Sequence, residues 1–138
     1  MNTHAPRPLP ALTSDTMPFW TAGAHGQLLI QQCCLCSYFI HPPTGFCPEC
    51  ENSETVYTAV SGRGFVETFT VNYKIWMPGL PDRYVLALVR LAEQNDVRLA
   101  TNIVGCDPAS VRFDMPVKVQ FEQTGDLWIP LFAPDPVP

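Results

Sequence analysis

Four of the six cysteines form two CxxC pairs, and their spacing is typical of a metal site. The pairs are Cys33 with Cys36 and Cys47 with Cys50, with ten residues between them. Two CxxC turns bring four soft thiolate ligands to one ion, which suits tetrahedral zinc. We predict bound Zn²⁺, with iron as an alternative because four thiolates suit both metals. Four protein ligands leave no open coordination position, so the predicted site is structural rather than hydrolytic.

The other cysteines and the histidines do not complete a second site. A nucleophilic cysteine needs a base or a cation beside it, whereas Cys106 is followed by Asp107 and Cys34 lies inside the first CxxC pair. We interpret both thiols as packed side chains. His41 is near the cysteines, although four sulfurs already complete a tetrahedral set. The sequence therefore indicates no catalytic residue.

The sequence predicts a cytoplasmic location. Residues 1–10 contain three prolines and no apolar stretch of the kind that a secretory signal needs. No run approaches the roughly 18 apolar residues of a membrane span. Cytoplasmic thiols stay reduced, and paired CxxC motifs there bind metal rather than form disulfides. Disulfides are therefore the weaker alternative for the four cysteines.

The charge balance disfavours nucleic acid as a partner. Eight Lys and Arg residues against thirteen Asp and Glu residues give a net charge of −5. Proteins that bind single strands combine a basic groove with aromatic platforms. Phe65, Phe69 and Tyr73 could supply the platforms, but the basic residues are scattered singly along the chain.

A short helix is expected before the cysteines, at about residues 16–25. Ser14-Asp15 is the candidate N-cap, and Gly26 suits the end of the helix. Phe19 and Trp20 give this helix a large apolar surface. Bulky aromatics serve cores and interfaces alike, so these rings either pack on the chain's own ribbon or barrel or contact a partner subunit.

The remaining chain is predicted to be β. A strand at 27–32 leads into the first CxxC pair and residues 38–40 return antiparallel to it, as in a zinc ribbon. About five strands follow, with a helical turn at Asp107-Pro108 between the third and the fourth. The expected strands are Phe65–Tyr73, Tyr84–Leu91, Val97–Val104, Pro116–Gln123 and Leu127–Leu131. This layout fits a closed barrel of the OB type.

Two of these strands carry specific expectations. Alternation places Phe65, Phe69 and Val71 on one face of their strand and Val66 on the other. The segment Tyr84–Leu91 is nearly all apolar, so we expect it to be buried on both faces or covered by a neighbour.

The segment 74–83 joins the first two barrel strands and is unusually apolar for a loop. It contains Ile75, Trp76, Met77 and Leu80. An apolar loop at a barrel rim indicates a partner face or the wall of an acyl pocket. The alternative is that Trp76 folds back and plugs the end of the barrel.

The predicted fold class is mainly β, in three parts. Residues 1–26 form an N-terminal arm and short helix, and residues 27–58 form a zinc ribbon. Residues 59–138 form a five-stranded OB-fold barrel with a proline-rich tail.

The chain resembles the DUF35 family, in which a rubredoxin-like zinc ribbon precedes an OB-fold. The resemblance covers roughly residues 17–123. The matching segments are Phe19-Trp20, Gly26–Leu29, Gln32–Cys36, Pro42-Pro43, Cys47–Cys50, Ser61–Gly64, Val85–Leu91, Thr101–Gly105 and Met115–Val117. The family usually has glycine after each CxxC pair and before Met115, where this sequence has Ser37, Glu51 and Asp114.

The resemblance implies an accessory role. Family members are often paired with thiolase-like proteins that act on coenzyme A thioesters by acyl transfer or retro-aldol cleavage, some of them with hydratases in steroid side-chain degradation. The implied function is that of a non-catalytic subunit in a hetero-oligomer. Acyl-CoA binds in the complex, and the partner carries out the chemistry. The alternatives are a stand-alone acyl-CoA or lipid-binding protein and a single-stranded nucleic-acid-binding module.

Overall fold

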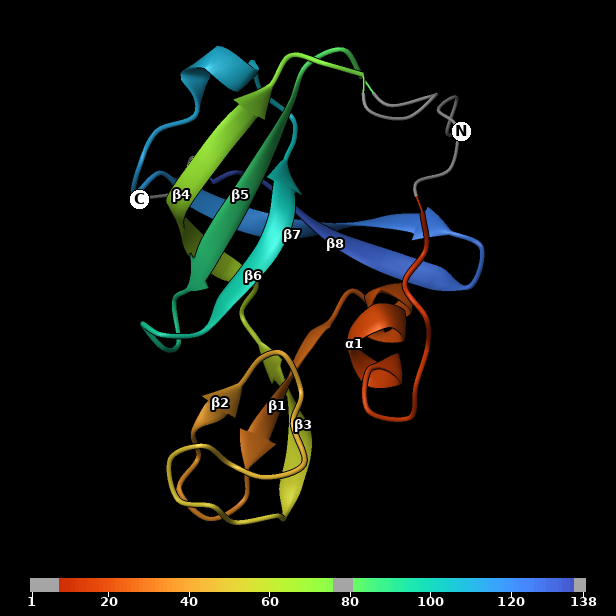
Figure 1. Ribbon diagram of the computed structural model, residues 1–138, viewed down its shortest axis with the longest axis vertical. Helices are drawn as coiled ribbons and strands as arrows, with labels where there is room; N and C mark the ends of the chain where they lie inside the picture. The colour runs from red at the N-terminus through yellow and green to blue at the C-terminus, as the bar shows by residue number, and fades with distance from the viewer. Residues whose placement is uncertain (1–7, 76–80, 136–138) are drawn as a thin grey trace.

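The computed structural model describes residues 8–75 and 81–135. It contains a short N-terminal helix, a three-stranded antiparallel sheet and a closed five-stranded barrel (Figure 1). The predicted fold class is therefore confirmed.

The N-terminal helix is shorter than predicted and has a different cap. α1 spans Met17–Thr21 and continues as the 3-10 turn η1, Ala22–His25, which ends at Gly26 with φ +70°. The predicted cap at Ser14-Asp15 is wrong, because the N-cap is Thr16 and its side chain makes no cap hydrogen bond. The Thr16 side chain bonds back to Thr13 instead, as acceptor from the Thr13 backbone N–H at 3.1 Å.

The absence of a side chain at Gly23 lets this helix lie directly on the barrel. A Cβ at Gly23 would come within 2.5 Å of Trp128 Cβ and within 2.6 Å of the Phe121 ring. Real Cβ atoms do not approach other atoms so closely, so any larger residue would push η1 away from the last two strands.

The ribbon sheet has the order β2-β1-β3, with β1 Leu28–Cys33, β2 Phe39–Ile40 and β3 Thr55–Val60. β1 is antiparallel to both neighbours, which confirms the predicted antiparallel return. β3 pairs with β1 over its whole length. The predicted boundaries of the three parts of the chain, between residues 26 and 27 and between residues 58 and 59, stay a prediction.

The barrel strands are β4 Arg63–Asn72, β5 Tyr84–Leu91, β6 Arg98–Ile103, β7 Pro116–Thr124 and β8 Leu127–Pro134. Their order around the barrel is β4-β5-β6-β8-β7. The predicted helical turn is present as η2, Pro108–Ser110, between β6 and β7.

One core joins the helix, the ribbon and the barrel. Phe19 from α1 and Leu28 and Ile30 from β1 belong to the same buried cluster as the barrel interior. The barrel contributes Val66, Val85, Val89, Leu91, Leu99, Val117 and Phe132, among others. Shared burial makes the ribbon and the barrel parts of a single packed unit.

The predicted alternation in β4 is wrong because the strand contains a β-bulge. Its pairing with β5 jumps from Val66↔Val89 to Thr68↔Leu88. The extra residue exchanges the faces of the strand. Val66 before the bulge and Phe69 and Val71 after it therefore all pack in the core.

Of the two expectations for β5, burial of both faces is wrong, while cover of its outer face by a neighbour stays a prediction. Val85, Ala87, Val89 and Leu91 are buried, but Leu86 is 47% exposed and Leu88 is 37% exposed. The barrel covers only its inner face, so an apolar strip lies on the outside of the sheet.

Candidate metal centre

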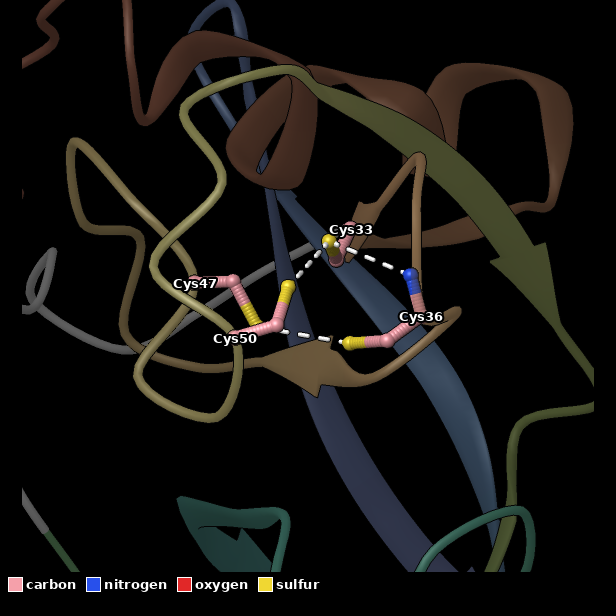
Figure 2. A group of neighbouring side chains, drawn as sticks. All are labelled: Cys33, Cys36, Cys47 and Cys50. Carbon is pink, nitrogen blue, oxygen red and sulfur yellow. Dashed lines mark hydrogen bonds between the residues drawn. The ribbon is translucent and has the colours of Figure 1, made fainter.

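The four cysteines of the two CxxC pairs converge on one point (Figure 2). Their Sγ atoms all lie within 4.8 Å of one another. Cys33 Sγ is 3.5 Å from Cys50 Sγ, and Cys36 Sγ is 3.6 Å from Cys47 Sγ. A disulfide would need about 2.05 Å. Four sulfurs at about 2.3 Å from a central zinc ion stand about 3.8 Å apart, so this donor set fits a tetrahedral metal ion.

Each CxxC pair forms its own turn, and the two turns have the same pattern of hydrogen bonds. In the first, the Cys33 N–H donates to the Tyr38 carbonyl and the Ser37 N–H donates to the Cys33 carbonyl. In the second, the Cys47 N–H donates to the Asn52 carbonyl at 2.8 Å and the N–H four residues later donates back to the Cys47 carbonyl at 2.8 Å. The same hydrogen-bond pattern therefore shapes both turns.

The backbone of these turns also stabilises thiolate. The N–H groups of Cys36 and Leu35 point at Cys33 Sγ, at 3.5 and 3.3 Å. These hydrogen bonds, of which that from the Cys36 N–H has the largest effect, lower the pKa of Cys33 to about 6. Desolvation by burial acts in the opposite direction. The thiolate form is the one that binds metal.

Each turn closes on a residue in the left-handed conformation. Ser37 has φ 66° and Glu51 has φ 67°, and Asp114 in the barrel has φ 60°. L-residues adopt this region at a cost in free energy, whereas glycine adopts it freely. These are the three positions at which the resemblance to the DUF35 family leads us to expect glycine.

A side chain of the barrel fastens the first turn in place. The Gln94 amide accepts from the Phe39 N–H and donates to the Phe39 carbonyl, both at 2.8 Å. The Tyr38 hydroxyl donates to Asp96 at 2.7 Å. This hydrogen bond raises the pKa of Tyr38 to about 12 and lowers the pKa of Asp96. The β5–β6 connection therefore sets the orientation of β2, which begins three residues after Cys36.

The aromatic residues predicted to contact a partner have different environments. Phe19 is 7% exposed and packs in the shared core, 4.8 Å from the Trp20 ring in an edge-on arrangement. Trp20 is partly buried against Ile129 and its neighbours in β8. Ile75 is 54% exposed. Trp76, Met77 and Leu80 lie outside the described residues.

The remaining candidates lie outside the sulfur cluster. The His41 ring is tilted against the Phe19 ring, with the ring centroids 4.9 Å apart, and burial lowers the pKa of His41 to about 4. Cys34 is exposed and Cys106 is partly exposed. Within the described ranges, no helix combines the length and apolar character needed to cross a membrane.

Sequence reasoning missed Gln94 and the exposed strip of β5. Gln94 lies in a turn whose residues are simply polar. Nothing in the sequence around it indicates a hydrogen bond to Phe39, 55 positions away. The strip has a signal, but an ambiguous one, because a strand that is apolar throughout is also the pattern of a fully buried strand.

Comparison with known proteins identifies both halves of the chain. Residues 20–56 match the family model described as "ChsH2, rubredoxin-like zinc ribbon domain", and residues 57–122 match "ChsH2, C-terminal OB-fold domain". A solved structure named "Ltp2-ChsH2(DUF35) aldolase" is similar over 91% of this chain and 98% of that chain, with 32% identity and a TM-score of 0.82. A DUF35 structure from Sulfolobus solfataricus shows the same fold at 17% identity and a TM-score of 0.61.

Two curated relatives are longer proteins. One is the "Probable enoyl-CoA hydratase alpha subunit" of Thermomonospora curvata, 34% identical over 93% of this chain. The other is the "3-oxo-4,17-pregnadiene-20-carboxyl-CoA hydratase alpha subunit" of Mycobacterium tuberculosis, 32% identical over 91% of this chain. The chain spans 40% of the length of each. With its ribbon, its barrel and its near-complete overlap with a solved relative, the chain belongs to the DUF35 family of ChsH2-like proteins.

Proposed function

We propose that this chain is a cytoplasmic, non-catalytic subunit that binds a thiolase-like enzyme acting on acyl-CoA thioesters, by acyl transfer or retro-aldol cleavage. The observation that carries the proposal is the similarity to the Ltp2-ChsH2(DUF35) aldolase, whose matched chain is covered almost completely. Both curated relatives have names that include a CoA thioester, and one of these is a steroid derivative. A steroid side chain is therefore a candidate substrate.

The cysteine cluster supplies structure in this proposal. Cys33, Cys36, Cys47 and Cys50 hold Zn²⁺, with iron as the alternative, and the ion fastens the ribbon that β1 ties to the barrel core. Because all four ligands come from the protein, the ion offers no site for substrate. The chemistry then belongs to the partner.

The contact residues follow from exposure. Phe19 is 7% exposed and packs mostly in the chain's own core, so among the described candidates Trp20 and Ile75 keep the most surface for a partner or for acyl-CoA. The neighbouring Tyr73 is 71% exposed. We keep Trp76, Met77 and Leu80 as proposed contacts on their sequence alone.

An acyl-CoA or lipid carrier is the second candidate, favoured by an apolar hollow beside the barrel. A nucleic-acid module has less support. OB-folds bind oligonucleotides on the face of their second and third strands, which here carries Leu86, Leu88 and Ala100. Arg98 on that face is paired with Glu67.

The test is co-purification. The tagged chain is isolated from extract of its native cells and its partners are identified by mass. We expect a stoichiometric thiolase-like protein, and cleavage or acyl transfer of CoA esters by the complex but not by this chain alone. Recovery without a partner at low salt would contradict the accessory role and favour the carrier.

The metal assignment has its own matched test. Cys36 and Cys34 are both exposed and lie two residues apart, but only Cys36 belongs to the cluster. Cys36→Ser should lose bound metal in elemental analysis, whereas Cys34→Ser should keep one equivalent. Equal metal content in both variants would remove Cys36 from the ligand set.

A further inference from the structure

The closed barrel is weakest between β6 and β8. These strands pair through a single pair of residues, Ile103 and Phe132, although β6 pairs with β5 from Arg98 to Ile103. Figure 1 shows the β7–β8 hairpin swinging away from β6, with α1 on its lower side. The two strands therefore enclose a gap that side chains of other elements border.

Pro130 explains why the pairing of β6 with β8 is so short. The Thr101 hydroxyl donates to the Pro130 carbonyl at 3.0 Å, so this carbonyl faces β6. The N and O atoms of a strand residue point to the same side. Proline has no N–H to donate, so β8 lacks a ladder donor at this point and the hydroxyl of Thr101 replaces the ladder bond.

The gap forms a groove of about 380 Å³ with an apolar lining. Its wall residues include Phe19, Trp20, Leu99, Ala100, Ile129 and Leu131. The arm at 8–10 and the exposed Leu86 border it as well. None of the described residues that line the groove has a charged side chain. A second hollow of about 270 Å³ also borders on Leu86 and Ala100, so the apolar surface continues across β5 towards β4.

We infer that this groove binds the uncharged, apolar end of an acyl thioester. The volume lies in the range of small-molecule sites, roughly 300–1,000 Å³. The neutral lining and the net charge of −5 disfavour the anionic part of a coenzyme, which must lie elsewhere. A peptide would need main-chain partners along a strand edge, and on the β8 side Pro130 has no donor and its carbonyl already accepts from Thr101.

The acyl thioester is named on the strength of the proposed function, while the groove and its neutral, apolar character come from the described residues. The test uses the full-length, metal-loaded chain and uncharged probes, the methyl esters of butanoate, hexanoate and octanoate. Calorimetry should show saturable binding that tightens about fourfold for each added CH₂ group. Methyl resonances of Leu99 and Ile129 should shift, while those of Val56 on the ribbon should not.

Filling the groove should abolish this binding. Ala100→Phe places a ring in the groove at an exposed strand position and should weaken octanoate ester binding at least tenfold. Ala59→Phe is the matched control at an exposed position of β3 and should bind as the unmodified chain does. Leu86→Lys, which puts a charge at the exposed border, is a second variant and should weaken binding too.

The outcomes separate this inference from the proposed function. No saturable binding, or binding unchanged by Ala100→Phe and Leu86→Lys, overturns the acyl site while co-purification with the thiolase-like protein still stands. If the unmodified chain binds no ester and Ala100→Phe instead blocks co-purification, the groove is a polypeptide-docking site and the acyl assignment is wrong. If the ester binds but no partner co-purifies, the acyl site stands and the accessory role fails.

Discussion

Restoring glycine at the ends of the two CxxC turns should stabilise the protein. Ser37 and Glu51 hold φ values of 66° and 67°. An L-residue in this region costs about 1–2 kcal/mol, and glycine carries an entropic cost of about 0.5–1 kcal/mol. The difference predicts a gain of about 0.5–1 kcal/mol for Ser37→Gly and for Glu51→Gly.

Glycine at the third left-handed residue, Asp114, should have a smaller effect on stability than at Ser37 or Glu51. Asp114 has φ 60°, but its carboxylate lies 3.4 Å from Arg90, and aspartate tolerates this region better than most residues. Asp114→Gly relieves less strain and loses an ion pair, so its net effect should be close to zero.

Equilibrium unfolding in urea, with free zinc held constant, measures these differences. A gain of 1 kcal/mol corresponds to roughly 4 °C in Tm for a domain of this size. Ser53→Gly is the control, since Ser53 is exposed in the same ribbon and its φ is not positive. It should lose about 0.4–1 kcal/mol through the unfolded chain. If Ser37→Gly and Glu51→Gly lose as much as this control, the assignment of strain to the two turns is wrong.

Three further predictions concern the metal, pH and the contact between ribbon and barrel. Complete metal removal by a chelator, verified by elemental analysis, should lower the thermal midpoint because metal binding energy is folding energy here; an unchanged midpoint would contradict this. The pKa of His41 is about 4 in the folded protein and 6.5 in an ordinary histidine, so the folded state favours the neutral ring. The free energy of unfolding should therefore be highest above pH 6.5 and fall by about 2–3 kcal/mol as the pH is lowered to 4. Unfolding titrations should show a flatter pH dependence for His41→Phe over this interval, and identical slopes would refute the role of His41. Gln94→Ala leaves both polar groups of Phe39 unpaired and should cost about 1–3 kcal/mol in urea unfolding, whereas the exposed neighbour Asn95→Ala should change little.

Local features of the fold could be predicted because they depend on neighbours in the chain. The spacing within each CxxC pair determines that two sulfurs share a turn, and two such turns within eighteen residues determine a four-sulfur cluster. Gly26 marked the end of the helix because its left-handed φ is a local property. Alternation and turn residues located the barrel strands to within a few positions, although the N-cap of α1 was misplaced by one or two residues.

Side-chain orientation in the barrel could not be predicted, because it depends on pairing between distant strands. The bulge at Glu67 reverses the faces of β4 without any mark in the alternating sequence. Only the pairing of β5 with β4 and β6 shows that Leu86 and Leu88 face outward.

The sequence by itself determined a four-cysteine ribbon and a five-stranded barrel, since these follow from residue type and short-range spacing. Only the tertiary structure decided how they are joined. Gln94 reaches Phe39 across the ribbon–barrel boundary, and Thr101 bonds to Pro130 where the barrel closes through the short β6–β8 pairing. Each of these contacts joins residues far apart in the chain, and their approach is set by the packing of one shared core.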